Sequence, residues 1–227
     1  LDLPEVTHVF RDAPLTAQQE KYYKLLKKDM LMVAAGEEVS TVNAAINLNK
    51  LLQISGGAVY SDTGAVVEFD VSNRLRVIEE VINEASHKVL VFVPFTHTIE
   101  LLSAHLKAAG ITCEVINGAV TVNKRTEIFK RFQETTEPRV LLIQPQAASH
   151  GVTLTAADTI IWYAPVTSIE TYLQANARID RQGQKNKMTI VHIKGSPVET
   201  KLYHMLQNKL DVHSKIIDLY KKEVDEI

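Results

Sequence analysis

The sequence predicts an α/β fold: a parallel sheet flanked by helices, with an N-terminal helical segment and a long C-terminal helix. Two observations lead to this prediction. From Ser72 onward, short apolar runs alternate with amphipathic stretches of helical length, which is the pattern of parallel strands buried on both faces. Over residues 15–55, by contrast, apolar residues recur at helical spacing only.

The N-terminal part is predicted to be helical. Apolar side chains follow Leu15-Thr16 at helical spacing, at Tyr22, Leu25, Leu26, Met30 and Val33. A second helix is expected over residues 42–54, then a turn-rich stretch at 55–64 and a short strand at 66–69. The change of pattern divides the chain into a helical linker segment, residues 1–70, and a sheet domain, residues 71–227.

The sheet domain is predicted from its alternating elements. Helices are expected over residues 75–85, 99–109, 123–133 and 168–179. Strands are expected over residues 88–93, 113–116, 139–143, 159–163 and 189–193. Residues 197–224 are expected to form one long amphipathic helix, in which any break falls near Val212.

Composition is that of an ordinary globular protein. Its 227 residues, 45% of them hydrophobic, can bury a substantial core. The single cysteine, Cys113, excludes a disulfide framework and fits a reducing compartment, so a cytoplasmic location is expected. No histidine pairs with Cys or carboxylates at ligand spacing, so no metal site is expected in this chain.

Charge and the start of the chain limit the classes of function. A net charge of −2 argues against coating nucleic acid by bulk electrostatics, so any such binding must come from local groups. No apolar stretch reaches the length of a membrane span, and residues 1–4 do not begin a signal peptide. Since the first residue is not Met, a fragment of a longer protein is expected.

The run from Gln174 to Gln184 is the most informative motif. It places Arg178 and Arg181 three residues apart, on one face if the segment is helical. Paired guanidiniums can hydrogen-bond to phosphate oxygens and neutralise charge during phosphoryl transfer. Ligands of parallel sheets bind beyond the carboxyl ends of the strands, so we expect this helix to project toward that edge. The alternative is a solvated helix face with an Arg-Asp-Arg pattern.

Several motifs of nucleotide enzymes are missing. The chain has no Gly-rich loop ending in Gly-Lys-Ser/Thr and no strand-terminal Asp-Glu pair for Mg²⁺. It also lacks the Gly-x-Gly-x-x-Gly turn of a Rossmann-like enzyme and the Gly-x-Ser-x-Gly elbow of a hydrolase. A phosphate read by the arginines would therefore belong to a nucleotide held elsewhere.

Residues 144–158 and 174–184 together resemble motifs V and VI of the C-terminal RecA-like lobe of superfamily 2 nucleic-acid-dependent ATPases, specifically Swi/Snf-type double-stranded DNA translocases. The Ser149-His150-Gly151 segment and the Arg-Gln-Gly-Gln ending are most similar to members from bacteriophages, prophages and bacteria. The resemblance covers nearly the whole chain. Weaker matches, in the family's order, are residues 15–23, 51–55 and 88–94, and Gly118 with Arg125 and Phe129.

The resemblance implies roles for individual residues. Arg181 would be the arginine finger, assisted by Arg178, and the nucleotide side would also include Gln174, Gly151 and Asp158. Contacts to DNA would come from Ser149, His150, Thr153, Thr96 and Arg125. For His150 a purely structural role, and for Arg125 a solvated helix face, stay open as alternatives.

The sequence departs from the family pattern at four places. Ala177 stands where Asp is frequent, Asp180 where His is frequent, and Thr153 where Asn is common. Ala148 and Ser149 replace paired glycines. These departures leave the arginine-finger expectation intact and put the details of DNA contact and interlobe coupling in doubt.

The resemblance implies a C-terminal motor lobe of an ATP-dependent DNA translocase or helicase, inactive by itself. An N-terminal RecA-like lobe of the same protein would hold most of the ATP and the Mg²⁺, and double-stranded DNA would be the track. A non-catalytic nucleic-acid-binding or scaffold module of the same shape is the first alternative. A Rossmann-like nucleotide-binding enzyme is the second.

Overall fold

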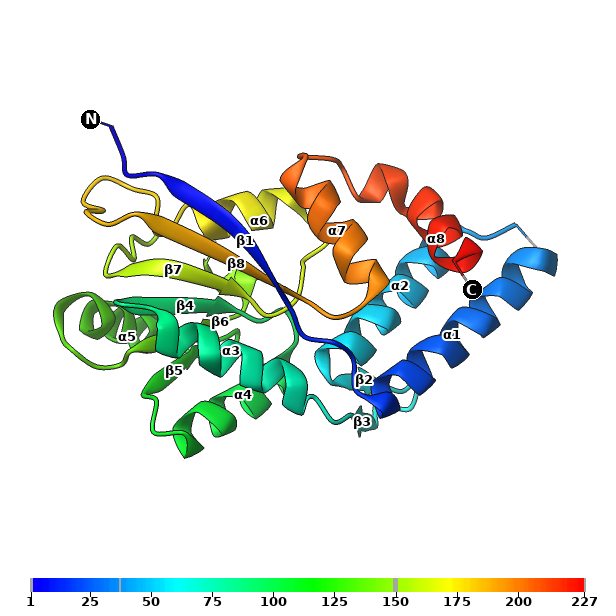
Figure 1. Ribbon diagram of the computed structural model, residues 1–227, viewed down its shortest axis with the longest axis horizontal. Coiled ribbons are helices and arrows are strands. Elements are labelled where there is room, and N and C mark those ends of the chain that lie inside the picture. The colour runs from blue at the N-terminus through cyan, green and yellow to red at the C-terminus, as the bar shows by residue number, and fades with distance from the viewer. Residues whose placement is uncertain (1, 37, 149–150, 227) are drawn as a thin grey trace.

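The computed structural model describes residues 2–36, 38–148 and 151–226, and its main feature is a six-stranded sheet (Figure 1). The strand order is β1-β8-β7-β4-β6-β5, and every neighbouring pair is parallel. The strands are β1 Val6–Asp12, β4 Lys88–Phe92, β5 Cys113–Ile116, β6 Val140–Ile143, β7 Ala157–Trp162 and β8 Met188–Lys194. The predicted parallel α/β architecture is confirmed.

Helices cover both faces of the sheet, because its central strands are apolar on both sides. One face packs against α5 Val122–Glu134, α6 Ile169–Asn176 and α7 Pro197–Gln207. The other packs against α3 Ser72–Glu84 and α4 Thr96–Ala108. Each residue of β6 and β7 is buried, and β6 is accordingly apolar throughout, whereas β7 also buries Asp158 and Thr159.

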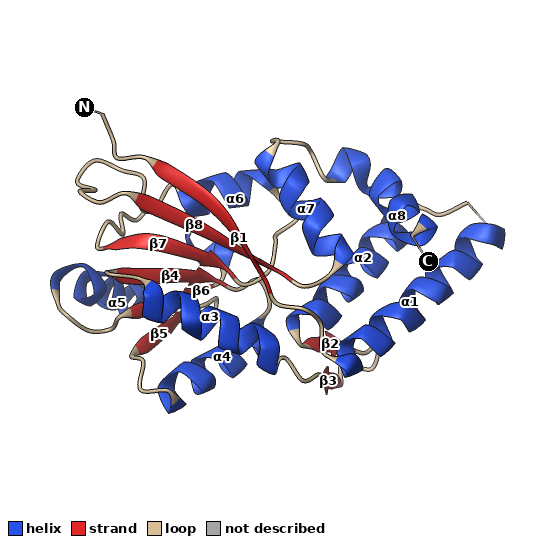
Figure 2. Cartoon of the chain, viewed as in Figure 1, coloured by secondary structure: helices blue, strands red, loops and turns tan. Residues whose placement is uncertain are grey.

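A third core lies beyond the carboxyl ends of the strands, on the right of Figure 2. It joins α7 to three further helices, α1 Ala17–Gly36, α2 Thr41–Gly56 and α8 Ile216–Asp225. A small hairpin, β2 Ala58–Tyr60 and β3 Val66–Glu68, follows α2. Within the described residues, no helix is long and apolar enough to cross a membrane.

A buried ion pair joins this helical layer to the sheet. Arg74 on α3 donates from both terminal nitrogens to the Glu199 carboxylate, at 2.6 Å each, and also to the Tyr163 carbonyl at 2.7 Å. Glu199 lies in the first turn of α7 and accepts from Ser196 Oγ at 3.0 Å. The Ser196 hydroxyl also hydrogen-bonds to Ser55 Oγ near the end of α2, at 2.8 Å.

The structure differs from the sequence prediction at the N-terminal end of the chain, and it breaks the C-terminal helix near Val212, where the sequence analysis placed any break. Residues 1–70 are not only helical, since β1 forms an edge of the main sheet. Its side chains are half-buried or exposed, so no apolar run marks it. The C-terminal helix is two helices, because Lys209 has a φ of 54° and Asp211 then accepts from the His213 N–H in a turn.

Candidate functional site

The two arginines lie in the turns that follow α6, because this helix ends at Asn176. The Arg178 carbonyl accepts from the Leu154 N–H at 2.9 Å, and Gln184 Nε2 donates to the Ala157 carbonyl at 2.9 Å. These bonds fix the segment beside the start of β7, and it leads directly into β8. The arginines therefore lie at the amino ends of β7 and β8, and the expected projection toward the carboxyl edge is wrong.

Arg178 is held by two backbone carbonyls. Its Nε donates to the Gln174 carbonyl at 2.9 Å and its Nη1 to the Val152 carbonyl at 3.3 Å. The residue is only 4% exposed. Burial, and then the charge of Arg181, lower the pKa of Arg178. An anion placed here would raise the pKa of Arg178 again, because it would compensate two neighbouring positive charges.

Arg181 is held in a parallel way and is more exposed. Its Nε donates to the Ala177 carbonyl at 3.0 Å, and its Nη1 donates to the Gly151 carbonyl at 2.8 Å and to Thr153 Oγ1 at 3.4 Å. Among the described residues, all acceptors of the two arginines are neutral. No ion pair among the described residues includes either guanidinium.

The backbone carbonyls of Gly151 and Gln174 accept hydrogen bonds from the two arginines. Gly151 has a φ of 70°, in the left-handed region that favours glycine, and an added Cβ would meet no atom within 4 Å. Glycine is thus favoured for its backbone conformation, and its carbonyl binds Arg181. The Gln174 side chain donates to Glu170 Oε1 at 3.0 Å, and the Gln174 carbonyl accepts from Arg178 Nε.

Asp158 is bound to a histidine from another segment of the chain. It lies at the start of β7 and is 8% exposed. Its carboxylate hydrogen-bonds to His87 Nδ1 at 2.6 Å and accepts from Thr159 Oγ1 at 3.3 Å. The structure does not bond Asp158 to either arginine.

A second group lies at the carboxyl ends of β4, β5 and β6. Thr96 Oγ1, at the start of α4, accepts from Gln144 Nε2 at 2.9 Å. Arg125 Nη2 donates to the Asn117 and Val120 carbonyls at 3.3 Å each, and its Nε is buried without a hydrogen-bond partner in the described structure. Residues 144–156 connect this group to the arginines. The predicted DNA contacts Ser149 and His150 lie outside the described residues.

Gln184 and Gln133 had no role in the sequence analysis. Gln184 holds the segment that carries the two arginines in place, and Gln133 holds residues 155–156. Gln184 is buried and donates to the Ile179 carbonyl as well as to Ala157. Gln133 accepts from the Ala156 N–H at 2.7 Å and donates to Thr155 Oγ1 at 3.3 Å. Gln184 closes the arginine motif and could have been suspected. Gln133 lies in the last turn of α5 and carries no sequence signal.

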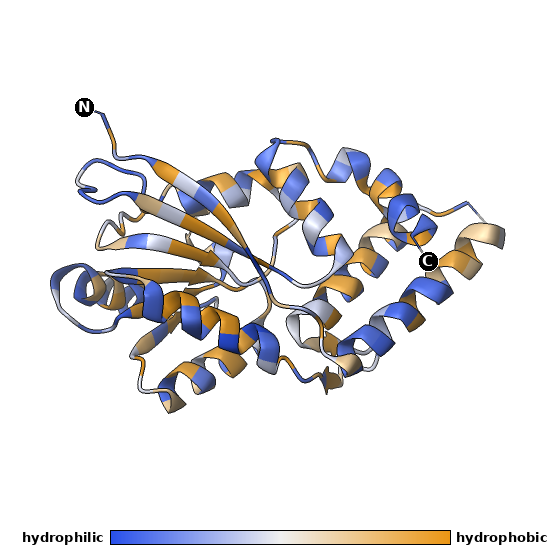
Figure 3. Cartoon of the chain, in the orientation of Figure 1, coloured by the Kyte–Doolittle hydropathy of each residue, from blue (hydrophilic) through white to orange (hydrophobic). Residues whose placement is uncertain are grey.

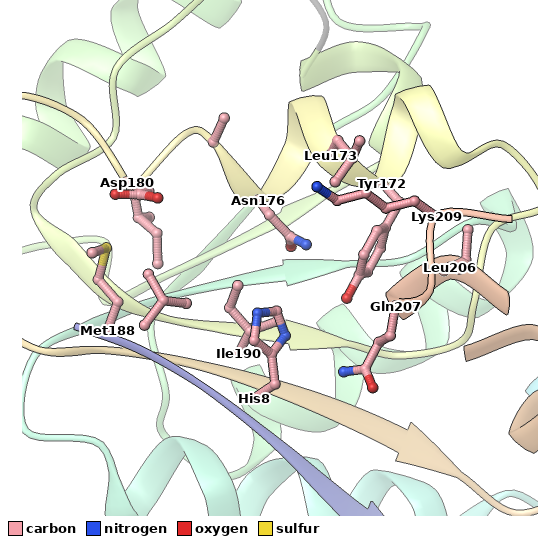
Figure 4. A pocket seen from close by; sticks show the side chains of 13 residues that line it. His8, Tyr172, Leu173, Asn176, Asp180, Met188, Ile190, Leu206, Gln207 and Lys209 are labelled. Carbon is pink, nitrogen blue, oxygen red and sulfur yellow. The ribbon is translucent and has the colours of Figure 1, made fainter. Parts of the chain in front are cut away.

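A pocket of about 500 Å³ lies next to residues 172–180, which lead into the two arginines (Figure 4). Asn176 and Asp180 line it from that segment, and His8 lines it from β1. Tyr172 forms part of its wall and hydrogen-bonds to buried His192 Nε2 at 2.8 Å. Because His192 Nδ1 faces the Val9 carbonyl at 3.1 Å, Nδ1 carries the proton and Nε2 accepts from tyrosine.

We expect acidification to weaken the fold through His192. Burial lowers its pKa to about 4, against 6.5 for the free side chain; the Val9 carbonyl opposes this shift and His8 adds to it. The unfolded chain therefore binds the proton first, and this contribution to stability, complete above pH 6.5, is lost as pH falls toward 4. The loss should reach about 3 kcal/mol.

Urea unfolding at pH 7 and pH 4.5 measures this effect. His192→Gln should lower the free energy of unfolding at pH 7 but lose less of it on acidification. His213→Gln, at an exposed position, should lose as much free energy of unfolding on acidification as the unsubstituted protein. Equal acid losses in all three proteins would contradict the assignment.

Comparisons with known proteins find similar sequences and folds. Residues 73–183 match the family model for the helicase conserved C-terminal domain. The nuclear protein STH1/NPS1 of Saccharomyces cerevisiae is 27% identical over 240 residues, which cover 97% of this chain and 18% of that protein. The chain spans 18 to 25% of the length of the first curated relatives it matches.

Solved structures confirm the RecA-like fold. The crystal structure of the C-terminal part of the Fun30 ATPase domain matches with a TM-score of 0.79 at 17% identity, covering 99% of this chain and 98% of that chain. The Sulfolobus solfataricus SWI2/SNF2 ATPase core in complex with dsDNA matches with a TM-score of 0.73 at 20% identity, covering 98% of this chain and 48% of that chain. The similarity to bacteriophage members stays a prediction. These matches support the C-terminal RecA-like lobe of a Swi/Snf-type superfamily 2 helicase.

Proposed function

We propose that this lobe serves an ATP-dependent DNA translocase and that Arg181, assisted by Arg178, acts as an arginine finger. The observation that carries the proposal is the pair of guanidiniums held by neutral acceptors, without a carboxylate partner among the described residues. Preorganised positive charge of this kind stabilises the charge that develops on a transferring phosphoryl group.

ATP and Mg²⁺ would be held mainly by an N-terminal lobe of the same protein. Two uncompensated guanidiniums fit the phosphates of ATP. In the described residues, no group of three or more His, Cys, Asp or Glu side chains could hold a metal ion. Mg²⁺ bound on the other lobe would neutralise phosphate charge, while this chain would orient its guanidiniums and exclude water.

Double-stranded DNA is the proposed track. Thr96 and Arg125 lie together at one edge of the sheet, and Thr153 lies beside Arg181 at the other end of residues 144–156. This segment, with Ser149 and His150, would link DNA contact to the nucleotide site. The Sulfolobus core, of similar fold, was solved with dsDNA. We also propose the cytoplasm as the location, since the only cysteine, Cys113, is buried and free.

ATP turnover measured on the isolated chain and on the full-length protein, each with and without duplex DNA, tests this division of labour. The isolated chain should hydrolyse ATP negligibly, and the full-length protein should respond to DNA. DNA-stimulated turnover by the isolated chain would refute the proposal. A full-length protein that binds DNA without any turnover would favour the scaffold module.

A further inference from the structure

One face of α1 carries exposed apolar side chains, of which Tyr22 also packs edge-on against Phe69, with ring centroids 5.2 Å apart. Thirteen large apolar residues are exposed among the described residues, and five of them lie on this helix: Tyr22, Leu25, Leu31, Met32 and Val33. In Figure 3 the far end of α1 has the colours of apolar residues and lies at the periphery of the molecule. Single surface hydrophobics are ordinary, whereas a cluster on one helix marks an interaction surface.

The spacing of these residues forms a seam along the helix. Alternating steps of four and three connect Gln18, Tyr22, Leu25, Asp29 and Met32, which we call the outer stripe. This is the a/d spacing of a coiled coil. The buried residues of α1 lie on its other side and face the core, at Gln19, Tyr23, Lys27 and Met30. The outer stripe is therefore a second packing face of the helix, about 20 Å long.

Positive charge borders the outer stripe on one side. Lys21 and Lys28 occupy the flanking g positions, both are exposed, and no ion pair in the described structure includes them. The other lysines of α1 near the stripe have partners: Lys24 pairs with Glu20 at 3.4 Å, and Lys27 with buried Glu223 at 3.8 Å. The unpaired lysines would be compensated by acidic side chains on an adjacent element.

We propose that the outer stripe binds an amphipathic helix of a partner polypeptide, with apolar residues against Tyr22, Leu25 and Met32 and acidic residues against Lys21 and Lys28. The narrow a/d pattern suits the width of one helix. A nucleic-acid backbone would contact the lysines and leave the apolar residues exposed. A second copy of this chain would bring no acidic residue to the lysines, because the facing e positions are Gln19, Leu26 and Val33.

Peptide binding to the purified chain tests the proposal. The probe is a labelled synthetic peptide of about three heptads with Leu at a and d, Glu at e and g, and one Lys facing Asp29. Its own glutamates disfavour self-association. A matched peptide has Lys at e and g. Fluorescence anisotropy should show binding of the Glu peptide and at least about tenfold weaker binding of the Lys peptide.

Variants of the chain locate the contact. Leu25→Glu with Met32→Glu should weaken binding of the Glu peptide by at least about tenfold. Val122→Glu, at a site on α5 that is 73% exposed, should leave binding unchanged. Lys21→Glu with Lys28→Glu should reverse the preference between the two peptides, a result that unfolding would not produce. Circular dichroism checks the fold of each variant.

Three results would overturn the proposal. The first is no binding of the Glu peptide, and the second is equal binding of both peptides. The third is a dimer of the unsubstituted chain in sedimentation velocity that Leu25→Glu with Met32→Glu dissociates, because a second copy would then be the occupant.

Discussion

Arg181→Ala in the full-length protein should lower DNA-stimulated ATP turnover by roughly 10³- to 10⁵-fold, the range typical of arginine fingers. ATP affinity should change little, because most of the nucleotide's contacts are proposed to come from the other lobe. The Nε of Arg181 binds the Ala177 carbonyl and its Nη1 binds the Gly151 carbonyl. The side chain is thus positioned before any nucleotide arrives, so its loss should appear in kcat rather than in KM.

Two further variants separate charge from geometry. Arg181→Lys keeps the charge but cannot make the bonds of both Nε and Nη1 and still present donors to a phosphate, so turnover should stay low. Arg76→Ala removes an exposed arginine that pairs with Glu80 at 3.7 Å, its one ion pair in the described part of the chain, and should leave turnover unchanged. Turnover close to normal in Arg181→Ala, with DNA stimulation intact, would refute the finger role.

Arg178 requires a separate test, because it is more buried and binds the Gln174 and Val152 carbonyls. Its removal would also loosen the segment that carries Arg181. Kinetics of Arg178→Ala therefore have to be compared with its free energy of unfolding, whereas Arg181→Ala is the more direct test.

Much of the fold was predictable because a strand that is buried on both faces of a sheet has a continuous run of apolar residues. β6 is apolar at every position and was predicted almost to its ends. β1 was not predicted. It is an edge strand with exposed residues, such as His8 and Phe10, and such a strand needs no apolar run. The end of α6 at Asn176 also left no signal, since Ala177 is a good helix former. The bond from the Leu154 N–H to the Arg178 carbonyl helps to determine where the chain turns.

The candidate site was predictable where chemistry follows the motif and unpredictable where it depends on contacts between distant segments. Spacing and residue type identified Arg178 and Arg181. Their position at the amino ends of the strands, and the pairing of Asp158 with His87, depend on tertiary structure. The same holds for Arg74 and Glu199, which are 125 residues apart and lie in segments with no shared pattern.

Removing one member of the Arg74–Glu199 pair should destabilise the fold more than any substitution at an exposed ion pair. Both side chains are almost completely buried, at 3% and 0% exposure. Burial lowers the pKa of Arg74, but the Glu199 carboxylate more than offsets this and raises it overall. Arg74→Met, or Glu199→Gln, leaves a buried charge without its partner, which costs about 3 to 5 kcal/mol. Urea unfolding followed by circular dichroism measures the loss.

A double-mutant cycle separates the pair from its surroundings. Glu199→Gln keeps an oxygen that can accept from Ser196 Oγ and the Gly195 N–H, so the main loss is the charge opposite Arg74. Combining it with Arg74→Met removes both charges, and the double variant should be less destabilised than the sum of the singles. The exposed Arg76–Glu80 pair is the matched control, and Arg76→Met should cost less than about 0.5 kcal/mol. Additive losses at Arg74 and Glu199 would show that the two charges do not stabilise each other. The junction between the helical layer and the sheet would then depend on the hydroxyls of Ser55 and Ser196 and on the apolar contacts around them.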